Sequence, residues 1–168
     1  PARTTILLGS ASYLLTGRRG PNVGVEYGLR LRLMGPWSIG VRGFLEAAGA
    51  RIDLGQTSSG ARHIQGVATL WWTPWQTERW GVAAGAGVGV MGLGSEDLDA
   101  ALLPREDTAY TTLLEARLQG SWTPVSWLGV HAWGSVGFGL PGLILEFDGQ
   151  QEGMGAIAGA GLGASVRF

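Results

Sequence analysis

The sequence predicts an all-β fold, an eight-stranded antiparallel up-and-down β-barrel that spans a membrane. Three observations lead to this prediction. Apolar residues alternate with small or polar ones along eight stretches, and a period of two is typical of an extended strand with two different faces. Glycine, 30 of the 168 residues, collects on one of those faces. Most of the eight tryptophans lie beside three of the connections between strands.

The last stretch, 153–168, shows the alternation most clearly. Its apolar face is expected to carry Met154, Ala156, Ala158, Ala160, Leu162, Ala164, Val166 and Phe168. Glycine makes up most of the other face, together with Ile157, Ser165 and Arg167. The stretch is longer than an ordinary strand of ~5–6 residues, and longer than the ~9–11 residues that a tilted strand needs to cross a bilayer. Its length therefore favours a membrane-spanning strand.

Seven further strands are expected before it, at 5–16, 22–35, 38–53, 62–73, 81–94, 109–122 and 128–140. Alternation is blurred in the first, which indicates a β-bulge. It is clean in the second, where one face carries Val23, Val25, Tyr27, Leu29, Leu31 and Leu33. The fifth repeats the pattern of the last strand, with alanine and valine against glycine, and the others alternate in the same way.

The strands are separated by connections at 17–22, 35–37, 54–61, 73–80, 95–108, 123–127 and 141–152. Several contain Pro or Gly, and Pro marks a turn because it cannot donate a hydrogen bond to a strand ladder. In an up-and-down barrel, alternate connections lie at the same end.

Length and composition exclude several classes of protein. The chain is expected to form one domain, 1–168. Only 15% of its residues are charged, against roughly 25% in soluble domains. A net charge of −1 provides no basic field for nucleic acid. The absence of cysteine excludes a disulfide framework and Cys-based zinc sites, and no run of about 18 apolar residues predicts a transmembrane helix.

The small face of each strand is expected to point into the barrel. Eight strands enclose an interior just wide enough for packed side chains. Glycine and serine fit there beside larger residues such as Phe44 and Trp133, whereas the leucine, valine and tyrosine face would overfill it. The alternative is a soluble barrel with the apolar face inside.

The tryptophans favour the membrane alternative. Seven of them lie at or beside the second, fourth and sixth connections, which share one end of the barrel: Trp37, Trp71, Trp72, Trp75, Trp80, Trp122 and Trp127. A ring of tryptophan at one level is typical of the interfacial girdle of membrane barrels. Packing at the base of a soluble barrel remains the alternative explanation.

These patterns resemble the small eight-stranded outer-membrane barrels of Gram-negative bacteria, the class that includes OmpX-like and OmpA-type barrel domains. The closing-strand signal of that class corresponds here to Gly163, Val166 and Phe168, although glycine stands at position 161 where a polar residue is expected. The resemblance implies that the barrel-assembly machinery reads Phe168. It also implies an exported protein of the cell outer membrane, with its signal peptide removed, in contact with lipid, lipopolysaccharide and other envelope proteins.

In that class both termini are periplasmic. The resemblance therefore implies that the tryptophan-rich turns are periplasmic, and that the extracellular loops, which are short for the class, are 17–22, 54–61, 95–108 and 141–152.

Six charged residues are expected inside the barrel: Glu26, Arg30, Arg42, Glu46, Glu115 and Arg117. A hairpin folded about Pro36 would place Arg30 opposite Arg42, and Glu26 opposite Glu46. The six charges sum to zero, and buried ions must be paired to offset their desolvation. We therefore expect a salt-bridged network that closes the lumen, with a gated conduit as the alternative.

The chain has no recognisable metal site or catalytic motif. His63 and His131 are its only histidines, and neither lies in an H-x-H or HExxH motif, so no metal or cofactor is expected. His131, Ser135 and a carboxylate such as Glu115 could form a triad in principle. Some outer-membrane barrels are lipid A deacylases, but their sites face lipid, whereas His131 and Ser135 share the inward parity. We therefore expect no enzymatic activity.

The 95–108 connection is the most acidic segment, with Glu96, Asp97, Asp99, Glu106 and Asp107 beside Arg105. It lacks the calcium spacing D-x-D-x-D-G. A solvated loop is expected, and a divalent cation or a basic partner is the alternative.

The leading functional hypothesis is a structural or anchoring component of the cell envelope, or a subunit of a surface assembly. The alternatives are a narrow pore for ions or small solutes and, less favoured by the residues, a lipid-modifying enzyme.

Overall fold

A computed structural model describes residues 4–16, 22–48, 51–53, 58–96, 107–147 and 150–168. Within these ranges it describes the surroundings of side chains at 4–7, 23–46, 63–92, 110–140 and 156–168. None of the described residues forms a helix long and apolar enough to cross a membrane.

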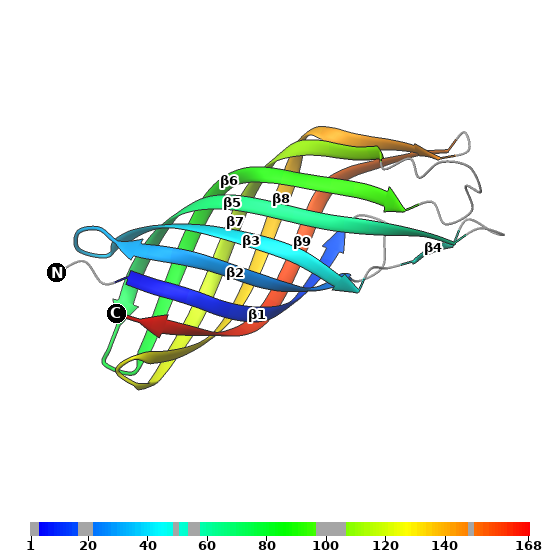
Figure 1. Cartoon of the computed structure of the whole chain (residues 1–168). Helices are drawn as coiled ribbons and strands as arrows, with labels where there is room; N and C mark the ends of the chain where they lie inside the picture. Colours follow the sequence, from blue (N-terminus) through cyan, green and yellow to red (C-terminus); the bar gives the residue numbers. More distant parts are fainter. Residues whose placement is uncertain (1–3, 17–21, 49–50, 54–57, 97–106, 148–149) are drawn as a thin grey trace.

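The described residues form a closed antiparallel barrel of eight long strands, as the sequence predicts (Figure 1). The strands are β1 (Thr4–Thr16), β2 (Asn22–Arg32), β3 (Trp37–Ala48), β5 (Ser58–Gln76), β6 (Trp80–Glu96), β7 (Asp107–Val125), β8 (Leu128–Phe147) and β9 (Gln150–Arg167). Each pairs with its neighbour in the chain, β1 pairs with β9, and β3 pairs with β5. The short β4 (Arg51–Asp53) pairs with the start of β5. A register shift between Leu7 and Ser10 gives β1 the expected bulge.

Several strands extend into segments expected to be connections. β8 continues to Phe147 and pairs with β9 from Gln150 onward, so most of 141–152 is strand rather than loop. Pro141 lies within a register shift between Phe138 and Leu143, which hides the period of two in the sequence. At the other end, β5 continues to Gln76 and β7 to Val125.

The expected extracellular loops are only partly described. Residues 17–21, 54–57 and 97–106 lie outside the described part of the chain. Of the charged residues of the acidic connection, Glu96 ends β6 and Asp107 begins β7, while Asp97, Asp99, Arg105 and Glu106 lie outside the described residues.

The hairpin between β2 and β3 turns at Gly35, which corrects the predicted register. Gly35 has φ +57°, a left-handed conformation that costs glycine little. With this centre, Arg42 lies opposite Gly28 and Arg30 opposite Gly40. Glu26 is paired with Phe44, and Glu46 with Gly24. The predicted pairing was wrong by two residues because it placed the turn at Pro36, one residue too late.

The outer wall of the barrel is apolar and uncharged. Along β2, for example, Val23, Val25 and Tyr27 are exposed while Gly24 and Glu26 are buried. Outward-facing side chains carry no charge in the described wall segments 23–31, 37–45, 64–72, 80–90, 110–122, 128–140 and 156–168. A continuous apolar surface of this extent suits hydrocarbon rather than water. The apolar face is therefore outside, which confirms the membrane-spanning orientation.

The side chains that point into the interior are of mixed character. The buried apolar residues are Phe44, Val67, Trp71, Ala83, Met91, Leu113, Trp133 and Ile157. The buried polar residues include Glu26, Arg42, His63, Gln65, Arg117 and His131. The start of β1 and the end of β9 lie at the same end of the barrel as the turns that follow β2, β5 and β7 (Figure 1). We call it the turn end.

Candidate functional site

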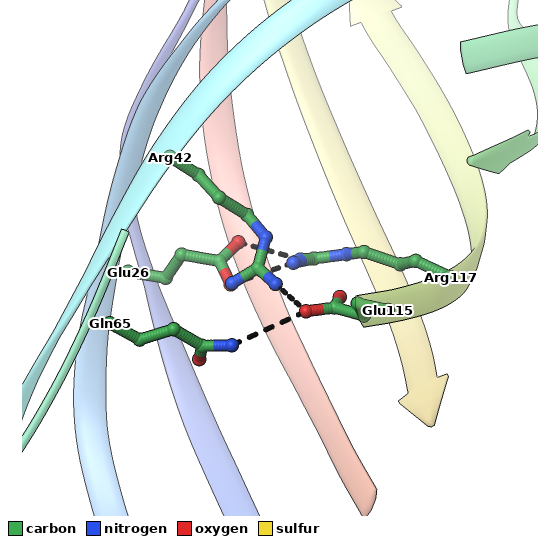
Figure 2. A network of polar contacts seen from close by, with 5 residues as sticks. All are labelled: Glu26, Arg42, Gln65, Glu115 and Arg117. Carbon is green, nitrogen blue, oxygen red and sulfur yellow. Dashed lines mark hydrogen bonds and ion pairs between the residues drawn. The ribbon is translucent and has the colours of Figure 1, made fainter. Parts of the chain in front are cut away.

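The most distinctive feature of the lumen is a buried ion cluster formed by Glu26, Arg42, Glu115 and Arg117 (Figure 2). Each of these residues occupies an inward position of its strand: Glu26 on β2, Arg42 on β3, and both Glu115 and Arg117 on β7. In the closed barrel β7 faces β2 and β3 across the lumen, so the cluster joins opposite walls.

Glu26 is the centre of the ion cluster. Arg117 donates two hydrogen bonds to its carboxylate, at 2.7 Å to Oε2 and 2.6 Å to Oε1. Arg42 donates a third, at 3.1 Å to Oε2. The other terminal nitrogen of Arg42 pairs with Glu115 Oε2. Two-pronged contacts between arginine and carboxylate are among the strongest hydrogen bonds in proteins.

The ion cluster is almost completely removed from solvent. Its four side chains have between 1% and 7% of their surface exposed. Two positive and two negative charges are therefore desolvated together, and their mutual pairing offsets that cost. The guanidinium of Arg117 also lies 3.7 Å from the centroid of a Trp133 ring, in cation–π contact. Gln65 donates to Glu115 Oε2 at 3.4 Å.

An apolar layer packs against the ion cluster on the side away from the turn end. Phe44 follows Arg42 by two residues on β3, and Leu113 precedes Glu115 by two on β7. Both are fully buried, as is Met91 on β6. The void between this layer and the ion cluster measures about 10 Å³, roughly the space that one water molecule needs.

Arg30 and Glu46, expected in the same network, lie on opposite sides of it. Arg30 is four residues from Glu26 along β2, about 13 Å toward the turn end. It donates to Ser38 Oγ at 2.7 Å and to Thr73 Oγ1 at 3.0 Å. Glu46 lies two residues beyond Phe44 and accepts a 2.5 Å hydrogen bond from the His63 backbone nitrogen.

Comparison with solved structures shows which proteins share this architecture. No protein-family model matches the sequence, and no curated protein sequence matches it. Ail, the attachment invasion locus protein of Yersinia pestis, in complex with the heparin analogue sucrose octasulfate, has a TM-score of 0.61 at 12% identity, covering 99% of each chain. Neisserial surface protein A has a TM-score of 0.65 at 9% identity, covering 99% of this chain and 96% of that one.

A major outer membrane protein from Thermus thermophilus has a TM-score of 0.67 at 15% identity and full coverage of both chains. The chain has the fold of the small eight-stranded outer-membrane barrels. At such low identities the likeness concerns the fold. The uncharged outer wall is a separate observation, and it supports a lipid environment for this barrel.

Six tryptophans of the outer-membrane barrel are exposed near the turn end: Trp37, Trp72, Trp75, Trp80, Trp122 and Trp127. Trp80 and Trp122 also contact each other, with ring centroids 6.1 Å apart. Trp71, expected in the same ring, is instead buried inside the barrel. Neighbouring residues of a strand face opposite sides, so Trp71 and Trp72 cannot both face lipid. Gly85 leaves room for the indole, since a Cβ there would lie 2.9 Å from Trp71 Cε3.

The residues of the closing-strand signal lie along the seam where the outer-membrane barrel closes. On β9, Gly163 pairs with Ser10 of β1, and Val166 pairs with Ile6. Phe168 exchanges backbone hydrogen bonds with Thr4, at 2.9 and 3.3 Å, and its side chain is exposed.

The candidate triad residues are far apart along β8. His131 and Ser135 both face the interior, and four residues of extended strand separate them by about 13 Å. Among the described residues, no group of three or more His, Cys, Asp or Glu side chains is placed to hold a metal ion.

Gln65 and Trp133 contact the ion cluster but were missing from the expected network. The alternation in the expected strands 62–73 and 128–140 already places Gln65 and Trp133 on the inward-facing side. Only the closed barrel shows that they reach Glu115 and Arg117.

Proposed function

We propose that the protein is a closed, non-catalytic outer-membrane barrel that serves as a structural or anchoring component of the cell envelope, or as the membrane subunit of a surface assembly. The observation that carries this proposal is the blocked lumen. The ion cluster and the apolar layer of Phe44, Met91 and Leu113 occupy the middle of the barrel. The void between them measures about 10 Å³, roughly the space that one water molecule needs.

The ion cluster is suited to a mechanical role. Arg117 connects β7 to Glu26 on β2, and Glu115 connects β7 to Arg42 on β3, so these contacts brace the wall across the lumen against flattening. Charged groups that pair with one another in a low-dielectric interior form strong hydrogen bonds, which rigidify a fold. A conducting lumen would instead need charges that are separated by water.

The strand ends away from the turn end support the anchoring role. β7, β8 and β9 have 19, 20 and 18 residues, whereas a membrane crossing needs only ~9–11. In Figure 1, β8 and β9 reach further from the turn end than β1 and β3 do. The extra length of β8 and β9 forms a two-stranded backbone ladder beyond the residues that a crossing needs, and such a ladder provides a surface for a partner protein.

We expect the purified barrel to give no resolved conductance steps in planar bilayers. The quadruple variant Glu26→Ala, Arg42→Ala, Glu115→Ala and Arg117→Ala tests the ion cluster alone, because it removes the four charges without changing the net charge and leaves Phe44, Met91 and Leu113 in place. Steady openings of the wild-type protein that change when Arg42 or Glu115 is replaced would contradict the closed lumen and favour the narrow pore.

The assembly role predicts a stoichiometric companion when the barrel is purified from detergent-solubilised membranes under mild conditions.

The non-catalytic role is tested by mass spectrometry of lipid A from cells with and without the protein. A change in acylation would favour the lipid-modifying enzyme.

We further propose that Phe168 is recognised by the barrel-assembly machinery. Its exposed ring at the end of the β1–β9 seam supports this. Replacing Phe168 with alanine is expected to reduce the folded barrel in outer-membrane fractions several-fold, with little effect on refolding in detergent, because the Thr4 bonds use only the backbone. Leu162→Ala, also outward on β9, is the control. Equal outer-membrane levels of the Phe168 variant and the wild type would refute the proposal.

A further inference from the structure

Between the ion cluster and the turn end, the lumen contains a cavity of about 270 Å³. Three arginines that do not belong to the ion cluster line it: Arg30, Arg32 and Arg167. Hydroxyl groups of Thr5, Thr73 and Ser121 lie in the same lining. We call this cavity the basic vestibule.

Two of these arginines occupy one level of the wall. Thr5 of β1 pairs with Arg30 of β2 on one side and with Arg167 of β9 on the other. Adjacent strands lie about 4.8 Å apart, so the two arginine backbones are about 10 Å apart with a threonine between them. The Arg167 guanidinium reaches toward β8, where a Cβ on Gly129 would lie 3.6 Å from Nε and from a terminal nitrogen.

Arg30 is held in place before any ligand binds. Its Nε donates to Ser38 and a terminal nitrogen donates to Thr73, at 2.7 and 3.0 Å. Its guanidinium lies 4.6 Å from the centroid of a buried Trp71 ring. An arginine fixed in this way loses little side-chain freedom on binding, which favours affinity for an anion.

The vestibule carries an excess of positive charge. Among the residues described as lining the vestibule, Glu26 is the acidic one. Its carboxylate is already bound by Arg42 and Arg117 within the ion cluster. The groups that bind Arg30 and Arg32 are neutral: two hydroxyls for Arg30, and the Gly35 carbonyl at 3.2 Å for Arg32. Arg167 adds a third arginine to the lining and also has a partner within the protein.

We propose that the basic vestibule is a binding site for a small oxyanion of the phosphate type. Arginine guanidinium groups match the oxygens of phosphate in geometry and charge, and the hydroxyls supply further donors. A bound oxyanion would also relieve the mutual repulsion of the three arginines.

The cavity volume suits free phosphate, diphosphate or a phosphate monoester headgroup, but not the acyl chains of a lipid. The proposal does not depend on whether the barrel has a structural role, because the vestibule lies on the turn-end side of the ion cluster and would exist with either a closed or a conducting lumen.

The test is titration of the detergent-solubilised full chain with sodium diphosphate in a calorimeter at low ionic strength. The wild type is expected to bind saturably. Arg30→Gln and Arg167→Gln should each weaken binding about tenfold or more, because each removes a charged, two-pronged donor. Arg32→Gln should weaken it less, because Arg32 is exposed at the mouth.

Arg79→Gln is the matched control. Arg79 lies on the exposed turn between β5 and β6, at the same end of the barrel but outside the vestibule lining. Its loss should leave affinity within about twofold, since exposed charges are largely screened by salt and water. Circular dichroism checks that each variant is folded. If Arg167→Gln does not fold, Arg30→Gln and Arg32→Gln carry the test.

Absence of saturable binding by the wild type would overturn the proposal. An equal loss of diphosphate affinity in Arg79→Gln and Arg30→Gln would also overturn the proposal, because equal losses would show a diffuse attraction to positive charge rather than binding in the vestibule. A competition distinguishes the sources of the ligand. Displacement of diphosphate by phosphatidic acid in mixed micelles, but not by phosphatidylcholine, supports a headgroup in the vestibule, whereas no displacement by either supports a soluble oxyanion.

Discussion

Replacing Glu26 with glutamine is expected to lower the free energy of unfolding by about 3–5 kcal/mol, the usual cost of removing one partner from a buried ion pair. Glu26 binds both Arg42 and Arg117 and is 1% exposed. Without its negative charge two guanidinium groups stay buried, and the new amide nitrogen faces arginine donors. Denaturant unfolding of the barrel in micelles, followed by tryptophan fluorescence, measures the change.

Two comparisons show whether the loss comes from buried charge. Glu78→Gln, on the exposed turn between β5 and β6, should change stability by less than about 1 kcal/mol, as exposed charges usually do. Glu115→Gln should cost less than Glu26→Gln, because Arg42 keeps its bond to Glu26. If Glu26→Gln were as mild as Glu78→Gln, the ion cluster would not hold the barrel together.

Replacing Leu118 with arginine should destabilise the barrel in a bilayer by about 2–4 kcal/mol, the range for arginine near the midplane of a membrane barrel. Leu118 faces outward on β7 with 64% of its surface exposed. It lies four residues from Trp122, which places it well inside the apolar belt. Unfolding of the protein in phosphatidylcholine bilayers measures the loss.

Ser126→Arg provides the control for depth. Ser126 is exposed on the turn after β7, where arginine near the interface costs only about 0–1 kcal/mol. Equal effects at positions 118 and 126 would contradict the membrane-spanning orientation. So would a wild-type protein that stays monodisperse without detergent.

The strands could be predicted because side-chain direction in a strand is local information. The alternation of Val23, Val25 and Tyr27 with Gly24 and Glu26 identifies both faces of β2 before any partner strand is known. Strand ends were less predictable. Beyond Phe138 the bulge around Pro141 removes the period of two, although the backbone ladder between β8 and β9 continues.

The pairing of residues across the β2–β3 hairpin and across the lumen was harder to predict than the strand ends. A turn centred on Gly35 instead of Pro36 moves the opposite strand by two residues, which places Arg42 beside Gly28 rather than Arg30. Trp71 was also difficult to place. Its position near a turn suggested that it belongs to the interfacial ring of tryptophans, whereas the alternation along its strand points it into the barrel, where the structure buries it.

The sequence by itself determined that this chain forms long strands with two different faces, and which charged residues lie opposite the apolar face, because these properties follow from the two-residue period. The narrow interior of an eight-stranded barrel and the tryptophan ring then favoured the apolar face as the one that meets lipid. Only the tertiary structure decided which enclosed charges meet. Arg117 and Glu26 are 91 positions apart in the sequence. Their contact depends on closure of the barrel and on the tilt and stagger of its strands, which are properties of all eight strands together.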